Sequence, residues 1–254
     1  MRNDYPELFK VVKKKLLLIY QWLIFVPIFL VITIITTLTV MIMAPIFGRK
    51  TWGYYPAKWW SRITCWISLC KVTTRGHENL EKNRSYVFVA NHQGAFDIFV
   101  TYGFLNHNII WMQKHSLSNI PLVGFASKMA GHVFVNNTNA TTRAITLKEA
   151  ISKVKNGVSI VIFPEGSRTL TGKMRQFKKG AFYIATEEKL PIVPITLNGP
   201  FDVLKRGTLN INPGKLELVI HKPIPTENIS EEDIPELISK TTDVIYSQLW
   251  DKYK

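Results

Sequence analysis

The chain has 254 residues, 46% of them hydrophobic, and a formal net charge of +14 at pH 7. That length allows one sizeable α/β domain plus an appendage. Two cysteines, Cys65 and Cys70, form no C-x-x-C pair and accompany no cluster of metal ligands, so they are interpreted as apolar packing residues and no metal site is expected. Residues 1–225 hold all but three of the 32 basic side chains. A surface this basic favours anionic partners, which include phospholipid headgroups, phosphorylated substrates, acidic carrier proteins and nucleic acid.

The N-terminal run of residues 16–47 contains no charged side chain and exceeds the roughly 20 residues that one membrane crossing requires. A signal peptide would be shorter and would end at a small-residue cleavage site, whereas a buried helix of a soluble protein is the competing interpretation. Pro27 divides the run, which favours either one kinked span or a re-entrant pair of helices. We expect residues 1–50 to form a membrane anchor and residues 51–254 a globular α/β domain.

Basic residues flank this run on both sides. They are Arg2, Lys10, Lys13, Lys14 and Lys15 before it, and Arg49, Lys50, Lys58 and Arg62 after it. The positive-inside rule places both ends on the cytoplasmic side if the run is a hairpin, and it gives no orientation for a single span. The expected location is an inner or cytoplasmic membrane with the globular domain facing the cytoplasm. The aromatic stretch 51–69 that follows suits either the headgroup layer or a core-packing helix.

The globular part alternates short apolar runs with helical periods. Strands are predicted over 86–90, 109–113, 132–135, 158–163, 192–197 and 216–221, and helices over 97–105, 141–154 and 180–187. Such alternation predicts an α/β fold with a mostly parallel central sheet flanked by helices. A last helix is expected after Ser230 as N-cap, with an apolar stripe of Ile234, Leu237, Ile238, Ile245 and Leu249.

Two polar stretches follow predicted strands directly. In "VFVANHQGAFD", His92 comes just after the first buried strand and Asp97 lies near the start of the next helix. These two side chains meet only if the chain turns between them, which Gly94 makes easy. A carboxylate bonded to one ring nitrogen fixes the tautomer and leaves the other nitrogen as a base, although an unrelated exposed histidine fits the spacing alone.

The second stretch is "IVIFPEGSRTLTGKMRQFKKGAF", residues 160–182. It leaves a buried strand through Pro164 and Glu165 and then gathers basic side chains, namely Arg168, Lys173, Arg175, Lys178 and Lys179. A planar guanidinium beside a glycine-opened backbone suits a phosphate, while a solvated basic loop is the alternative for the lysines.

Together these stretches resemble the glycerolipid acyltransferases, the family of 1-acylglycerol-3-phosphate acyltransferases. "NHQGAFD" is similar to their first motif, N-H-x4-D, and "FPEGSRT" to their third. "LPIVPITLNG" (190–199) resembles the fourth, apolar motif, and "QKHSLSNIPLVGFASKMAGHVFVNN" (113–137) the segment leading through the second. Four motifs in order, over about residues 75–200, are specific in a way that no single motif is.

The resemblance implies acyl transfer from acyl-CoA or acyl carrier protein to the hydroxyl of a glycerolipid, without a cofactor and without a covalent acyl-enzyme. It implies that His92 is the general base and Asp97 its orienter, and that Glu165, Gly166, Ser167 and Arg168 bind the acceptor's glycerol phosphate. Lysophosphatidic acid is the expected acceptor and phosphatidic acid the product.

One position departs from the family pattern. The second motif usually ends in an arginine, where this chain has Asn137. Arg143 or Lys114 are alternative sources of the missing charge, and another lyso-lipid acceptor is the alternative substrate.

Three other classes of protein fit the sequence less well. A hydrolase lacks support because no Gly-x-Ser-x-Gly elbow is present. A non-catalytic lipid-binding protein conflicts with the complete His92/Asp97 and Glu165/Arg168 sets. No nucleic-acid partner is expected, because no stacking motif interleaves with the basic residues.

Overall fold

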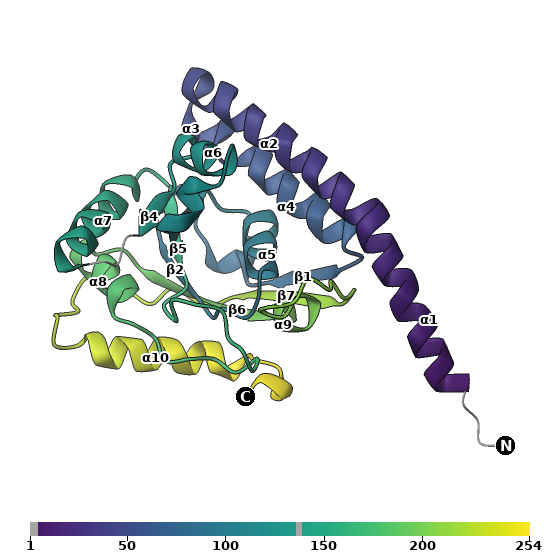
Figure 1. The fold of residues 1–254 in the computed structure, drawn as a ribbon. Helices are drawn as coiled ribbons and strands as arrows, with labels where there is room; N and C mark the ends of the chain where they lie inside the picture. The colour runs from purple at the N-terminus through teal and green to yellow at the C-terminus, as the bar shows by residue number, and fades with distance from the viewer. Residues whose placement is uncertain (1–4, 136–138) are drawn as a thin grey trace.

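The computed structural model describes residues 5–135 and 139–254 and contains a seven-stranded sheet in the order β1-β7-β6-β2-β5-β3-β4 (Figure 1). The strands are β1 (Lys71–Arg75), β2 (Val87–Ala90), β3 (Ile109–Lys114), β4 (Val133–Val135), β5 (Ser159–Ile162), β6 (Ile192–Asn198) and β7 (Lys215–Ile220). All neighbours pair in parallel except β6 and β7, which are antiparallel. The predicted mostly parallel sheet is therefore confirmed.

Burial explains which strands could be predicted from the sequence. Every residue of β2, β5 and β6 is buried, because helices cover both faces of the sheet, so these strands are continuous apolar runs apart from small polar residues. Strand β1 was not predicted. Its sequence, KVTTR, alternates exposed and half-buried residues at the sheet edge, where only β7 pairs with it.

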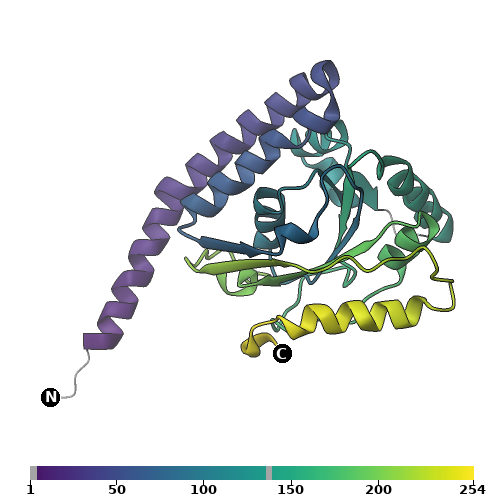
Figure 2. The same ribbon diagram turned by 180° about the vertical axis from the view of Figure 1, so that it is seen from behind.

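Helices cover both faces of the sheet (Figures 1 and 2). On one face, α4 (Tyr55–Ile67) and α5 (Phe96–Phe104) pack over a cluster that includes Phe88, Trp111 and Ile195. On the other face, α7 (Ala140–Lys153), α8 (Gly180–Glu187) and α10 (Ile234–Ser247) enclose a second cluster. Shorter helices are α3 (Arg49–Trp52), α6 (Val123–Met129) and α9 (Pro200–Val203), with 3₁₀ turns at His77–Asn79, His115–Asn119 and Asp251–Tyr253.

The start of the last helix differs from the prediction. Helix α10 begins at Ile234 and not just after Ser230. The Asp233 carboxylate accepts hydrogen bonds from the Ser230 N–H (3.0 Å) and hydroxyl (2.6 Å), which closes a separate turn before the helix. A proline in the first helical turn is also suited to a start there. The apolar stripe is as expected, since Ile234, Leu237, Ile245 and Leu249 are buried.

The N-terminal segment forms one uninterrupted helical rod. Helix α1 (Tyr5–Tyr20) passes through a π-helical turn (Gln21–Phe25) into α2 (Val26–Phe47). Pro27 lies just after the wide turn, which relieves the clash between a proline ring and the preceding turn. Figures 1 and 2 show α1 projecting beyond the body of the molecule, while α2 runs beside α4 and also contacts α6.

This rod is a candidate membrane anchor. Residues Val11–Phe47 are long and apolar enough to cross a membrane, and only 17% of the residues in their most apolar stretch are buried. That exposure is inconsistent with the core helix of a soluble domain. The aromatic stretch after the rod forms a helix with one face packed on the domain and another exposed. In α4, Thr64 and Cys65 are buried against the domain, whereas Trp59 and Trp66 are more than half exposed. Both cysteines are free and buried, as predicted.

Candidate active site

The two motif-bearing stretches lie side by side because their strands are neighbours. β2 and β5 pair in parallel with Val89 opposite Ile162. Both strands therefore end at the same edge of the sheet, one running into His92 and the other into Phe163. The carboxyl ends of parallel strands are where open α/β sheets place their ligand sites.

His92 and Asp97 are in direct contact. The His92 Nδ1 atom lies 2.6 Å from Asp97 Oδ2, and the Gly94 N–H donates to the same oxygen at 2.9 Å. The predicted turn at Gly94 thus brings the pair together. With Nδ1–H donating to the carboxylate, the Nε2 atom is left as the basic nitrogen. The His92 side chain is 17% exposed, so it is only partly buried.

Asp97 is held in an environment without solvent. Its side chain is fully buried at the first turn of α5. Burial raises the pKa of the Asp97 carboxyl above its ordinary value, and the hydrogen bonds from His92 and from the backbone of Gly94 and Gln93 oppose this rise. A buried carboxylate that depends on these donors is fixed in position, and it holds the imidazole in one orientation.

Neighbouring side chains restrain the imidazole further. The His92 ring stacks on Phe163, with ring centroids 4.1 Å apart and planes 10° from parallel, and Phe163 in turn stacks on Trp111. Asn91, the buried residue before the histidine, bridges β2 to β6 by exchanging two hydrogen bonds with the backbone of Leu197 at 2.8 and 2.9 Å. One face of the ring is therefore covered, and the strand end that carries it is tied to the sheet.

Glu165 joins the two loops through their backbones. Its Oε1 atom accepts the His92 N–H at 2.7 Å and its Oε2 atom accepts the Arg175 N–H at 3.0 Å. The side chain is 2% exposed, and burial raises the pKa of the Glu165 carboxyl to about 7 while the two N–H donors oppose the rise. Both carboxylate oxygens are thus directed at protein backbone.

The remaining residues of the third motif lie closer to solvent. Gly166 is exposed, whereas Ser167 and Arg168 are half-buried. The Arg175 guanidinium donates to the Ser167 hydroxyl, and the Thr169 N–H donates to the His92 carbonyl at 3.0 Å. Among residues 5–135 and 139–254, no ion pair joins Arg168 or Arg175 to a carboxylate. Two guanidinium groups without ion pairs in the described residues, on a loop bonded to the backbone of His92, are suited to bind an anion.

The structure brings all six predicted site residues to one edge of the sheet, and it shows contacts of two motif residues to which no role was assigned. Asn91 and Phe163 begin the first and third motifs, but an amide and an aromatic ring carry no signature that would predict a bridge to β6 or a stack on the histidine. Of the residues considered around the second motif, Lys114 is exposed at the end of β3. Asn137 and the side chain of Arg143 lie outside the part of the chain that the structure describes.

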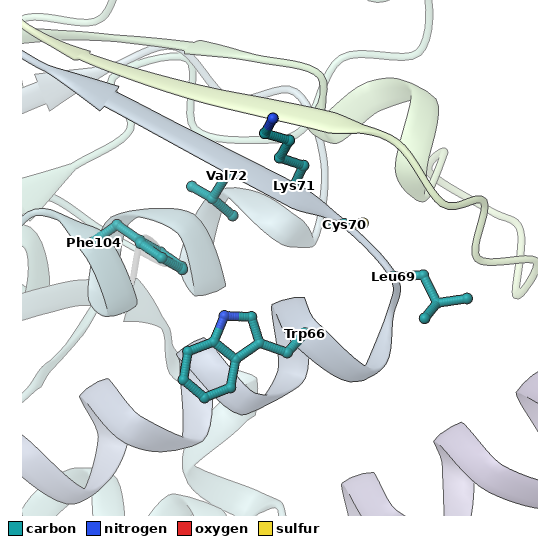
Figure 3. A pocket seen from close by; sticks show the side chains of 6 residues that line it. All are labelled: Trp66, Leu69, Cys70, Lys71, Val72 and Phe104. Atoms are coloured by element: carbon teal, nitrogen blue, oxygen red, sulfur yellow. The ribbon is translucent and has the colours of Figure 1, made fainter.

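A separate pocket of about 400 Å³ lies between α4, β1 and α5 (Figure 3). Its lining residues are Trp66, Leu69, Cys70, Lys71, Val72 and Phe104. Phe104 is at the opposite end of α5 from Asp97, about 10 Å away along a helix that rises about 1.5 Å per residue. None of the predicted site residues lines this pocket, so we assign it no part in the chemistry at His92.

The fold and the site together define an acyltransferase. A model of the family described as Acyltransferase matches residues 71–198, which include β1, both strand-end motifs and β6. The chain therefore belongs to the Acyltransferase family.

Individual members of the family are similar to the chain over most of its length. The chain is 35% identical over 178 residues to a chloroplastic 1-acyl-sn-glycerol-3-phosphate acyltransferase from Brassica napus, covering 69% of this chain and 51% of the relative. It is 31% identical over 199 residues to the 1-acyl-sn-glycerol-3-phosphate acyltransferase from Saccharomyces cerevisiae, covering 75% and 65%. The chain thus spans between about half and two thirds of the length of these relatives.

A solved structure extends the likeness to nearly the whole chain. The crystal structure of the 1-acyl-sn-glycerophosphate (LPA) acyltransferase PlsC from Thermotoga maritima matches with a TM-score of 0.75 and 28% identity. The match covers 93% of this chain and 94% of that protein, so it includes most of the N-terminal rod as well as the sheet.

Proposed function

We propose that the protein transfers a fatty acyl chain from a thioester donor to the free hydroxyl of 1-acylglycerol-3-phosphate, giving phosphatidic acid. The observation that carries this proposal is the contact between His92 and Asp97 at 2.6 Å, next to the loop that carries Arg168 and Arg175. The names of the similar proteins support the same acceptor.

His92 acts as the general base in this reaction. Its Nε2 atom takes the proton of the acceptor hydroxyl as the hydroxyl oxygen attacks the thioester carbonyl carbon. The tetrahedral intermediate then collapses, the carbon–sulfur bond breaks, and the imidazolium returns its proton to the leaving thiolate. The new ester forms directly, so no acyl group becomes attached to the enzyme. Asp97 stabilises the imidazolium and keeps the ring in the required tautomer.

The acceptor's glycerol phosphate is held by the third motif. Arg168 supplies the charge, while Gly166 and Ser167 supply a backbone and a hydroxyl that lie at or near the surface. Glu165 was expected to bind the glycerol phosphate as well. Because its two oxygens accept backbone N–H groups of His92 and Arg175, we propose that it serves the acceptor by holding both loops at their present separation.

The donor and the location follow from the surroundings of the site. Acyl-CoA and acyl carrier protein are both anionic and both suit the basic surface of the chain. We propose that the Val11–Phe47 rod attaches the enzyme to a membrane, where both lipid substrate and product reside, with the site facing the cytoplasm. No cofactor takes part in this scheme.

Thioester consumption by the purified protein in detergent tests the proposal. Acyl-CoA and acyl carrier protein donors are each offered with lysophosphatidic acid, a matched monoacylglycerol and lyso-phospholipids with larger headgroups. Consumption that requires lysophosphatidic acid, together with phosphatidic acid as product, is the expected result. Consumption with another acceptor would retain the chemistry at His92 and make Asn137 the mark of a changed substrate. A folded sample that consumes neither donor with any acceptor would overturn the catalytic proposal.

A further inference from the structure

The loop of residues 204–214, which joins α9 to β7, begins against the turn that carries the catalytic pair. A Cβ atom on Gly94 would lie 2.6 Å from the Pro200 carbonyl oxygen and 3.2 Å from the Leu204 carbonyl oxygen. Contacts this close admit only glycine, so α9 and the start of the loop are seated on the His92–Asp97 turn.

Arg206 extends from this loop to the third motif. Its Nη1 atom donates to the Arg168 carbonyl oxygen at 3.1 Å. The Thr169 N–H, one residue further on, donates to the His92 carbonyl oxygen at 3.0 Å. A short run of backbone therefore lies between the Arg206 guanidinium and the catalytic histidine, although 38 residues separate Arg206 from Arg168 along the chain.

The local backbone presents Arg206 at the tip of a tight turn. The Thr208 N–H donates to the Lys205 carbonyl at 3.2 Å, and Gly207 has a φ of +83°. A type II turn requires this positive φ in its third position, which glycine adopts without strain. Arg206 occupies the second position of the turn and is exposed.

Among the described residues, no carboxylate pairs with the charge of Arg206. A guanidinium carries five N–H donors, and its bond to the Arg168 carbonyl uses one of them. A guanidinium that is held at the backbone of Arg168 with most of its donors unused is suited to bind an anion.

We propose that Arg206 is a further ligand for the acceptor's phosphate and thereby a determinant of acceptor specificity. This inference rests on the proposed function. It supplies a second guanidinium beside Arg168 in a chain that has Asn137 where related second motifs usually end in arginine. Arg206 lies outside all four motifs, in a loop that reaches the site only in the folded protein.

Gln21 of the N-terminal rod positions the loop that carries Arg206. Its Nε2 atom donates to the Leu209 carbonyl at 2.6 Å, and its Oε1 atom accepts the Ile211 N–H at 2.9 Å. The side chain is 5% exposed and lies within the π-helical turn of the rod. A buried amide is costly unless it is bonded, and both ends of this one are bonded to the loop. Gln21 is therefore a positioning residue.

Acceptor kinetics of Arg206→Ala test the phosphate contact. The KM for lysophosphatidic acid should rise about 10–100-fold with little change in kcat, while the KM for a monoacylglycerol stays unchanged. Arg206→Lys should recover part of the loss because it restores the charge without the planar fork. Lys205→Ala is the matched control, since it removes the neighbouring charge from a side chain that lies over the Phe201 ring, and it should change KM by about twofold at most.

The outcomes separate this inference from the proposed function. Equal losses for both acceptors, or an equal effect of Lys205→Ala, would overturn the assignment of Arg206. A wild-type protein that does not acylate lysophosphatidic acid would instead overturn the proposed function. Thermal stabilisation by glycerol 3-phosphate gives a readout without turnover: the wild type and Lys205→Ala should be stabilised and Arg206→Ala should not. If glycerol 3-phosphate does not stabilise the wild type, the proposal that this site binds a phosphate is overturned.

Gln21→Leu tests the positioning of the loop. It should raise the KM for lysophosphatidic acid in the same direction as Arg206→Ala, and the double variant should be no worse than Arg206→Ala alone, because Gln21 acts through Arg206. Thr37→Val is the matched control, since Thr37 is a buried polar residue of the same rod that bonds to Ile34 of its own helix. Additive losses, or losses shared by the monoacylglycerol, would overturn the positioning role.

Discussion

The carboxylate of Glu165 accepts the backbone N–H of His92 at 2.7 Å, so a side chain of the third motif holds the histidine of the first. The same carboxylate binds the Arg175 N–H with its other oxygen. His92 and the basic loop at Arg175 are therefore fixed relative to each other by one buried carboxylate. Separate predictions follow for His92, Asp97, Arg168, Asn91 and Glu165.

Replacing His92 by alanine should lower turnover on the order of 10²–10⁴-fold, because a positioned general base contributes about that much. The measurement is thioester consumption at saturating acceptor, with circular dichroism to show that the variant is folded. His77→Ala is the control, since His77 contacts Thr74 near the edge strand β1. Near wild-type turnover in a folded His92→Ala protein would rule out the proposed mechanism.

Asp97→Asn should reduce turnover by a similar order, although it preserves the shape of the side chain. The amide presents an N–H to His92 or selects the other ring tautomer, so Nε2 no longer serves as the base. Because the two residues act as a unit, the double variant with His92→Ala should be no slower than His92→Ala alone. Multiplied losses in the double variant would show that Asp97 contributes independently of the histidine.

Arg168→Ala should raise the KM for the phosphorylated acceptor and leave the KM of the thioester donor nearly unchanged. The physical reason is that Arg168 is proposed to contact the phosphate of the acceptor and not the phosphate groups of the donor. Initial rates measured with each substrate varied in turn provide the comparison. Lys240→Ala, which changes an exposed lysine on α10, controls for a general loss of positive charge. An equal effect on both substrates would mean that Arg168 does not hold the acceptor.

Asn91→Ala should destabilise the protein. It leaves the N–H and carbonyl of Leu197, which is fully buried, without their side-chain partner, at a cost on the order of 1–3 kcal/mol for each unsatisfied group. The melting temperature should fall by about 2–4 °C per kcal/mol in a chain of this size. Asn119→Ala, at an exposed position, should leave it unchanged. An unchanged melting temperature for Asn91→Ala would refute the bridging role.

Glu165→Gln should change how stability depends on pH. The ordinary pKa of a glutamate is 4.5 and burial raises that of Glu165 to about 7, so the folded state binds more protons between these values. The free energy of unfolding therefore falls as the pH rises through this window, by at most about 1.4 kcal/mol per pH unit. Melting temperatures at pH 5 and pH 7 should show a larger advantage of wild type over Glu165→Gln at pH 5.

The same measurement on Glu149→Gln controls for the loss of a carboxyl group, because Glu149 is exposed and paired with Lys153 on α7. A wild-type advantage over Glu165→Gln that is the same at both pH values would contradict the raised pKa.

The buried parts of the fold were the most predictable from the sequence. Strands such as β5 (Ser159–Ile162) must be apolar because helices cover both sheet faces, so their runs are visible. Strand β1 was missed because its alternating threonines and charges carry no such run. Pro27 fitted a hairpin and a kinked span equally well, because a π-helical turn that absorbs a proline leaves no mark in the residues before it.

In the candidate site, too, some contacts could be predicted from the sequence and others could not. The contact between His92 and Asp97 was predictable because a strand end followed by a glycine turn leaves few ways for them to meet. The partners of Glu165 were not, since the backbone N–H groups that it binds are present in nearly every residue and have no sequence signature. Arg206 was not predicted because only tertiary packing brings its loop to Arg168.

The length of the N-terminal rod has a consequence for how the enzyme meets a bilayer. The uncharged run of residues 16–47 extends about 48 Å at about 1.5 Å per residue, which exceeds the hydrocarbon thickness of about 30 Å. Much of this length lies against the globular body, because Gln21 bonds to the loop at Leu209 and Ile211 and α2 contacts α4 and α6. We therefore expect the body to move with the rod, so that the angle at which the rod meets a bilayer sets the height of His92 above the acyl chains.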